Sequence, residues 1–188
     1  VDRRQRQMCI RDRMIKEGYD SVLKPFIDRG DIKIVKEDWA PNWMAEYAFN
    51  VADEVLQKGI KVDAIIAGDD ALAGGIIKAL ALHRLAGKIP VVGQDADLAA
   101  CQRIVEGTQA MTVYKPIDKL AEATARMAMK LARGEKLDVK NTIYDGKYYV
   151  PYYVIEPIPV DRSNLDDTVI KDGFHTRDQV YRNISISR

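Results

Sequence analysis

Short apolar runs of strand length alternate with helical patterns along most of this chain. Residues 62–67 (VDAIIA) form one such run, and the helical sequence ALAGGIIKALALHRLAG follows it. The same order recurs at residues 89–93 and again at residues 109–113. Strands that are apolar throughout and are joined by single helices are typical of a parallel sheet covered by helices on both faces. The alternation therefore predicts the α/β fold class.

The remaining periodicity extends this prediction toward both ends of the chain. The cleanest amphipathic helix is expected at 117–133, and a short strand is expected at 32–35. The other helices are expected at 14–29, 44–58, 71–87 and 98–107. After Gly134 the alternation stops, and the sequence favours extended segments within 141–160, a turn at Asp145–Gly146 and a short helix at 176–182.

The first thirteen residues, VDRRQRQMCIRDR, have five arginines and no apolar periodicity. They resemble translated sequencing-adapter read-through, in which strings such as MCIRDR recur, so we expect residues 1–13 to be disordered and irrelevant to the fold. The alternative is a basic arm that binds nucleic acid or a membrane surface. Without this segment the formal net charge falls from +1 to −2, because five arginines and two aspartates are removed. That change removes the case for a basic, nucleic-acid-binding protein.

Composition excludes several classes of protein and site. The remaining residues suffice for one ordinary domain but not for two. Cys101 is the only thiol left, so neither a disulfide framework nor a cysteine metal site can be built. No apolar run approaches the roughly 20 residues that span a bilayer. The chain has no phosphate-loop or dinucleotide fingerprint, and we expect no cofactor and no metal.

The sequence favours binding over catalysis. No serine or cysteine stands beside a plausible histidine, so a nucleophile paired with a base is not evident. Two carboxylates such as Asp69 and Asp95 could in principle transfer protons. Without a nucleophile, a metal cluster or a cofactor motif, a binding protein is the simpler interpretation.

Polar side chains follow three of the expected strands, at the edge where ligands bind in open α/β sheets. They are Asp69 and Asp70 after the first strand, Asp95 and Asp97 after the second, and Lys115 after the third. Helix capping accounts for only one acid at each helix start, so either Asp69 or Asp70 is left over. Asp97 is expected to cap its helix, which leaves Asp95 unexplained. Lys115 stands at the positive end of the next helix, where a cation is unfavourable, so a polar or anionic group is expected beside it.

Other conspicuous side chains are assigned structural roles on sequence alone. Trp43 lies off the apolar face of its helix, but a tryptophan at a helix start more often packs than binds a ligand. His83 and His175 have no ligand spacing around them, and Cys101 on an alanine-rich helix is expected to be a small buried hydrophobe.

Three ordered segments carry a family resemblance. KVDAIIAGDDALAGGIIKAL, VVGQDADLAACQRIVEGTQAMTVYKPI and DTVIKDGFH resemble the D-xylose-binding proteins of sugar ABC transporters, within the ribose-type class of periplasmic binding proteins. The resemblance implies a protein with two α/β lobes, a three-stranded hinge and a monosaccharide between the lobes. This chain resembles only the C-terminal half of that protein. The N-terminal lobe, its signal peptide and its sugar contacts are expected to be missing.

The resemblance also implies a division of the chain and a set of sugar-binding residues. The binding lobe would be 14–114, the segment 115–145 would cross the hinge with a helix packing on the other lobe, and 146–188 would hold return strands and the tail. The implied ligand-binding residues are Trp43, Asp69, Asp95 and Lys115. The tryptophan would cover the C–H face of the sugar while the charged groups bind its hydroxyls. Asp69 departs from the family, since relatives have asparagine there, and an ionised aspartate only accepts hydrogen bonds.

The resemblance implies a receptor that is not an enzyme, has no cofactor and binds no nucleic acid. It would deliver D-xylose or a related pentose to an ABC transporter permease in the periplasm by hinge closure. The alternative is the effector-binding core of a sugar-responsive transcription repressor, which shares the two-lobe fold. A helix-turn-helix upstream would indicate the repressor, whereas a signal peptide would indicate the receptor. An enzyme on the same scaffold would show turnover of the bound sugar, and a related fold binds autoinducers.

Overall fold

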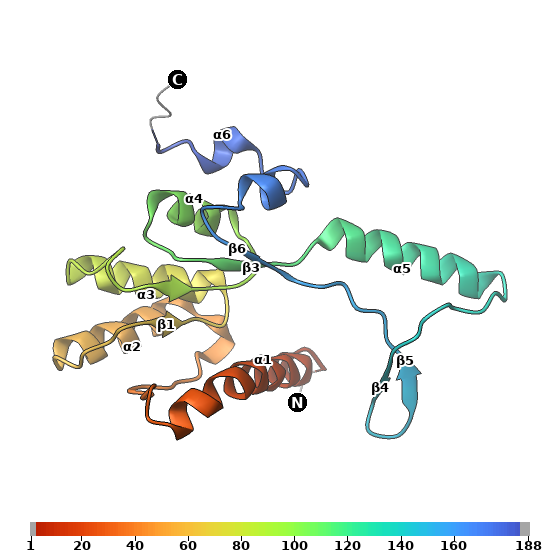
Figure 1. The fold of residues 1–188 in the computed structure, drawn as a ribbon, viewed down its shortest axis with the longest axis horizontal. Coiled ribbons are helices and arrows are strands. Elements are labelled where there is room, and N and C mark those ends of the chain that lie inside the picture. Colours follow the sequence, from red (N-terminus) through yellow and green to blue (C-terminus); the bar gives the residue numbers. More distant parts are fainter. Residues whose placement is uncertain (1–2, 185–188) are drawn as a thin grey trace.

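The computed structural model describes residues 3–184, with side chains from residue 12 onward. Helices and short strands alternate along the first two thirds of the chain (Figure 1). The helices are α1 (Arg3–Asp28), α2 (Ala45–Gln57), α3 (Asp70–Leu82), α4 (Leu98–Glu106), α5 (Ile117–Ala132) and α6 (Arg177–Val180), with a 3₁₀ turn at Pro41–Trp43 and a π-helical turn at Asp166–Ile170. The strands are β1 (Ile65–Ile66), β2 (Val91–Val92), β3 (Thr112–Tyr114), β4 (Thr142–Tyr144), β5 (Tyr149–Pro151) and β6 (Ile158–Val160).

The strands β1, β2 and β3 run parallel, which confirms the predicted α/β class. Ile65 pairs with Val91 in β1 and β2, and a parallel bridge joins Val92 to Met111 just before β3. β6 then adds to β3 in the antiparallel direction, with Val160 opposite Thr112. The parallel order places the carboxyl ends of β1, β2 and β3 at one edge of the sheet.

The strand expected at 32–35 is wrong. This segment has no regular structure, and Ile34 and Val35 are exposed. A short apolar run becomes a strand only where its backbone groups meet the hydrogen-bonding groups of a neighbouring strand. Ile66 of β1 is also 43% exposed, so the corresponding face of that strand is only partly covered.

Among the side chains that the structure describes, two buried clusters form the core. The first lies among β1, β2, α2 and α3, and Leu80 and Val91 are its largest fully buried members. The second joins α4 and β3 to β6 and the C-terminal segment, and it includes Tyr114, Val160 and Leu165. The residues from β6 onward therefore pack on the same core as α4 and β3.

The N-terminal segment differs from its predicted disorder. α1 extends back to Arg3, so the described part of residues 1–13 is helical and continuous with the helix expected from Met14. Arginine, glutamine, methionine and isoleucine all tolerate a helix, and neither glycine nor proline interrupts the sequence before Gly18. Its artefactual origin remains a prediction.

Most helix boundaries agree with the sequence predictions, but α3 ends at Leu82 and not at residue 87 as expected. α4 ends at Gly107, whose φ of 84° is the left-handed conformation that glycine adopts at low cost. α6 lies within the helix expected at 176–182, and Thr176 and Gln179 form a capping box at its start. None of the described helices is both long and apolar enough to span a membrane.

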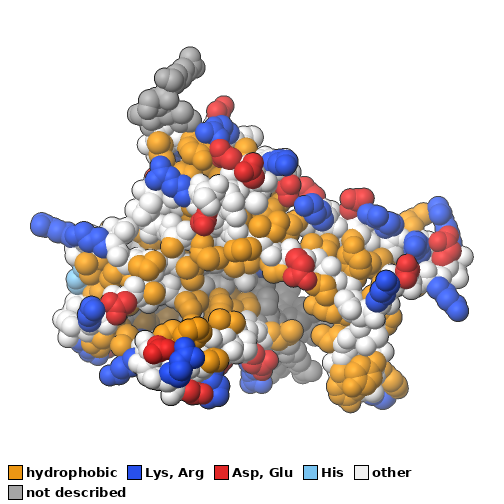
Figure 2. Space-filling model, viewed as in Figure 1, with side chains coloured by type: hydrophobic (Ala, Val, Ile, Leu, Met, Phe, Trp, Pro, Cys, Tyr) orange, Lys and Arg blue, Asp and Glu red, His pale blue; other side chains and the backbone are white. Residues whose placement is uncertain are grey.

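The segment from α5 to β5 projects from the rest of the molecule as an arm (Figure 1). Ile117, Leu120 and Leu131 on α5 are exposed. The hairpin of β4 and β5 carries exposed tyrosines, and Figure 2 shows hydrophobic side chains gathered over it. This arm leaves much more apolar surface in water than a helix packed on a domain would.

Cys101 offers a direct test of the packing around α4. Its side chain is fully buried, and burial raises the pKa of the thiol to about 12, with the charges of Asp70 and Asp97 adding to the shift. Because the thiolate is the reactive form, we expect Cys101 in a Cys9→Ser variant to resist iodoacetamide at pH 8 and to react quickly once the chain is unfolded. The neutral thiol stabilises the fold below the unfolded pKa near 9, and this contribution is lost as pH rises toward about 12. Rapid labelling of the native protein, detected by mass spectrometry, would contradict this packing.

Candidate functional site

The sheet brings the predicted polar residues to its carboxyl edge. Asp69 lies three residues beyond β1, Asp95 lies three residues beyond β2, and Lys115 directly follows β3. Because these strands are neighbours and parallel, the three side chains start from the same edge. The charges of Asp95 and Asp97 both raise the pKa of Asp69, so these acids lie close enough to interact.

Asp95 and Lys115 form an ion pair. Nζ of Lys115 lies 2.5 Å from Oδ1 of Asp95, and the two side chains are 46% and 41% exposed. The acid thus supplies the anionic partner that was predicted beside Lys115. An ion pair this exposed contributes at most about 1 kcal/mol to stability, so a polar ligand can replace either side of it at little cost.

The loop that carries Asp95 has an unusual backbone. Asp95 has a φ of 104° and Ala96 a φ of 56°, which are left-handed conformations that non-glycine residues rarely adopt. The backbone N–H of Asp95 donates to the carbonyl oxygen of Val113 at 2.9 Å. Nε2 of His175 lies 2.8 Å from the carbonyl oxygen of Ala96, and because that oxygen can only accept, this nitrogen is the donor. Such conformations cost about 1 to 3 kcal/mol each and are often retained at functional sites.

Asp69 caps α3. Its Oδ1 accepts a hydrogen bond of 2.7 Å from the backbone N–H of Leu72, whereas Asp70 turns inward and is almost completely buried. The sequence left open which of these two acids caps the helix, and the structure shows that it is Asp69. Asp69 is also the acid that the family resemblance assigned to the sugar. Burial raises the pKa of Asp69, and the hydrogen bond from Leu72 opposes that shift.

Asp97 corrects one prediction. It occupies the N-cap position of α4, but its side chain makes no capping hydrogen bond and is exposed. Its backbone N–H instead donates to Oδ2 of Asp70 at 3.0 Å. Asp70 thus holds the backbone of Asp97, while the carboxylate of Asp97 stays in solvent.

Trp43 lies beside the same edge. It ends the 3₁₀ turn, has a φ of 56° and is partly buried. A Cβ built on Gly68 would lie 3.0 Å from Cζ3 of the indole, so the ring packs on the glycine that precedes Asp69. Trp43 also lines a cavity of about 150 Å³ together with Trp39 and Ile66. Periodicity could not find this arrangement, because the approach depends on a glycine distant in sequence.

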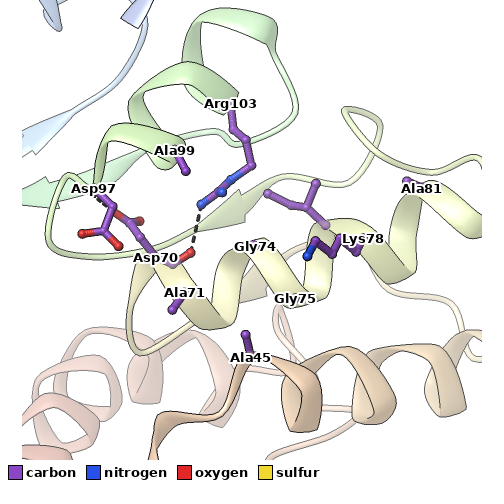
Figure 3. Close-up of a pocket in the computed structure, with 11 residues that line it drawn as sticks. Ala45, Asp70, Ala71, Gly74, Gly75, Lys78, Ala81, Asp97, Ala99 and Arg103 are labelled. Atoms are coloured by element: carbon purple, nitrogen blue, oxygen red, sulfur yellow. Dashed lines mark hydrogen bonds between the residues drawn. The ribbon is translucent and has the colours of Figure 1, made fainter. Parts of the chain in front are cut away.

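The larger of the two main cavities lies elsewhere. It has a volume of about 330 Å³ and lies among α2, α3 and α4, with Ala45, Gly74 and Arg103 among its lining residues (Figure 3). None of the four predicted ligand-binding residues lines it. Among the described side chains, no group of three or more histidines, cysteines and acids is placed to hold a metal ion. The predicted ligand-binding residues at the strand ends, Trp43, Asp69, Asp95 and Lys115, are all at least partly exposed.

This chain is similar to known proteins in sequence and in fold. Residues 10–136, more than half of the chain, match the family model described as "Periplasmic binding protein domain". The D-xylose-binding periplasmic protein of Haemophilus influenzae is 45% identical over 170 residues, which cover 90% of this chain and 51% of that protein. The D-xylose-binding periplasmic protein of Escherichia coli K12 is 43% identical over 169 residues, covering 89% and 51%. The predicted resemblance is confirmed.

A solved structure gives the same result for the fold. The ABC transporter solute binding protein from Clostridium phytofermentans, with bound β-D-glucose, matches with a TM-score of 0.73 and 29% sequence identity. The match covers 87% of this chain and 54% of that one. This chain therefore spans about half the length of the curated relatives it matches.

Proposed function

Because this chain belongs to the periplasmic binding protein family, we propose that it is the C-terminal half of a two-lobe sugar receptor of an ABC transporter. The proposed ligand is D-xylose or a related pentose, the proposed partner is the transporter permease, and the proposed location is the periplasm. The two D-xylose-binding relatives support the pentose, although other relatives are named as multiple sugar-binding proteins. In this proposal the lobe is formed by 14–114, 115–145 crosses the hinge and 146–188 returns to the lobe.

The observation that carries the proposal is the Asp95–Lys115 pair at neighbouring strand ends. The carboxylate and the ammonium group are both partly exposed and have opposite charges. Together they can accept a hydrogen bond from one sugar hydroxyl and donate a hydrogen bond to another. Asp69 would add a second acceptor, and the indole of Trp43 would cover the apolar face of the ring. No bond of the sugar is broken, and binding would be coupled to hinge closure.

The exposed arm supports the same proposal. α5 offers Ile117, Leu120 and Leu131 to solvent, and the chain covers only half of its relatives. A second lobe that packs on α5 would bury this surface and would form the opposite wall of the sugar site. Ligand sites of this kind bury most of the ligand, so a single wall is a poor site.

Calorimetry on one-lobe and two-lobe proteins tests the proposal. The two-lobe protein is made by joining the preceding half of the Haemophilus influenzae relative to this chain. We expect it to bind D-xylose at least about a hundredfold more tightly than this chain alone, because both walls are then present. D-Glucose and D-ribose, titrated in parallel, distinguish a pentose site from a broader one. Equal xylose affinity of both proteins, or no sugar binding by the two-lobe protein, would overturn the proposal.

A further inference from the structure

Asp70 is a buried acid that the proposed sugar contacts do not use. We propose that Asp70, acting with Thr112, is the positioning residue that holds the loop 94–97, and so the carboxylate of Asp95, in its sugar-binding conformation. This inference rests on the proposed function and assigns a role to a residue that touches no sugar.

The Asp70 carboxylate links the loop after β2 to Thr112, the first residue of β3. Oδ2 accepts from the backbone N–H of Asp97 at 3.0 Å and from the hydroxyl of Thr112 at 2.8 Å. That hydroxyl in turn accepts from the backbone N–H of Ala96 at 3.1 Å. The backbone N–H of Asp70 donates to the carbonyl oxygen of Gln94 at 2.9 Å. The loop is therefore held on both sides of Asp95 by one acid and its hydroxyl partner.

The strained backbone explains why such an anchor is needed. Asp95 and Ala96 both adopt left-handed conformations, which relax unless the surrounding contacts hold them. The anchor bonds to Ala96 and Asp97 follow Asp95 directly, so their loss would let the carboxylate move away from Lys115.

Hydrogen bonds from Gln109 and Arg103 fix the position of Asp70. Nε2 of Gln109 donates to Oδ1 of Asp70 at 2.8 Å, while Oε1 of Gln109 accepts from Nε of Arg103 at 2.9 Å. Nη2 of Arg103 also donates to the carbonyl oxygen of Asp70 at 2.9 Å (Figure 3). Because Arg103 fixes the amide orientation, Gln109 presents a donor to Asp70. All three groups facing the carboxylate are donors, and an asparagine at position 70 would place its own donor against one of them.

The backbone that follows β2 also packs closely on Asp70, which supports its role as the anchor. A Cβ at Gly93, directly after β2, would overlap Oδ1 of Asp70, so the backbone at this point packs directly on the acid. Burial raises the pKa of Asp70, and the hydrogen bonds from Thr112, Gln109 and Asp97 oppose that shift.

Hydrogen exchange on this chain tests the anchor without any sugar. In Asp70→Asn we expect the amides of Ala96 and Asp97 to exchange at least about tenfold faster, because both lose their link to the carboxylate. Leu80→Val, in the other buried cluster, serves as the control that lowers stability without touching the loop. An equal rise in both variants, or no rise in Asp70→Asn, would refute the anchor.

Sugar titration of the two-lobe protein tests whether the anchor acts through Asp95. We expect Asp70→Asn to weaken D-xylose binding about tenfold in an otherwise unchanged protein and to have no further effect in an Asp95→Ala background. A merely structural acid would reduce affinity equally in both backgrounds, and that result would overturn the inference. If the unchanged two-lobe protein binds no sugar, the proposed function fails, and hydrogen exchange still decides whether the anchor exists.

Thr112 supplies a milder pair of variants should Asp70→Asn fail to fold. Thr112→Val keeps the shape of the side chain but removes the hydroxyl, whereas Thr112→Ser keeps the hydroxyl. We expect the valine variant to lose protection at Ala96 and the serine variant to retain it. Equal protection in the two would contradict the assigned role of the hydroxyl.

Discussion

Replacement of Asp95 by alanine in the two-lobe protein should weaken D-xylose binding by about tenfold to more than a hundredfold, because a charged hydrogen bond is worth about 1.5 to 3 kcal/mol. Trp43→Ala should cost a comparable amount through lost stacking area. Isothermal titration gives both affinities, and thermal melts establish that each variant is folded.

Two further variants keep this prediction specific. Asp95→Asn retains a side chain that tolerates the left-handed backbone, so it separates the loss of charge from the release of strain. Asp97→Ala is the control, because that carboxylate is exposed and makes no capping bond. We expect Asp97→Ala to change neither stability nor affinity appreciably. If Asp97 proved essential and Asp95 dispensable, the assignment of the ligand group would be wrong.

A large loss of stability is expected from Gly75→Ala. α2 and α3 approach so closely at this point that a Cβ on Gly75 would overlap the carbonyl oxygen of Ala45 (Figure 3). The backbone of α2 cannot rotate away as a side chain can, so the helices must separate. Overpacking of this kind costs about 1 to 3 kcal/mol and occasionally more. Urea denaturation, followed by circular dichroism, measures the change.

Gly74→Ala is the matched control on the same helix. Its added Cβ would lie 3.2 Å from Nη1 of Arg103, at the end of a flexible side chain. Alanine also favours a helix interior over glycine by about 1 kcal/mol, which offsets a small shift of the guanidinium. We expect Gly74→Ala to stay within about 1 kcal/mol of the unchanged chain. Similar losses in the two variants would show that the helices do not meet at Gly75.

Sequence alone predicted the α/β class and the strand ends, because apolar runs and helix periodicity are local signals. Because Asp95 and Lys115 each follow a predicted strand, the sequence also predicted that they lie at one edge of the sheet. It could not choose between Asp69 and Asp70, because that choice depends on Thr112 and Gln109, which are distant in sequence.

The other errors have the same physical origin. Asp97 was expected to cap α4, but Asp70, the buried first residue of α3, holds its backbone. Residues 32–35 were expected to form a strand, but local composition does not provide a pairing partner. Trp43 required the family resemblance, since its contact with Gly68 is not encoded in periodicity.

β6 is synthesised late, and this order determines when the second buried cluster can form. Val160 and Leu165 belong to the buried cluster that includes Cys101 and Tyr114, yet the ribosome makes them only after the whole arm. Until then, the nascent chain holds half of that cluster open to water and to chaperones. A translation product that stops within the arm would therefore leave Cys101 and Tyr114 open to proteases, whereas a chain that extends through Val160 and Leu165 can close the cluster.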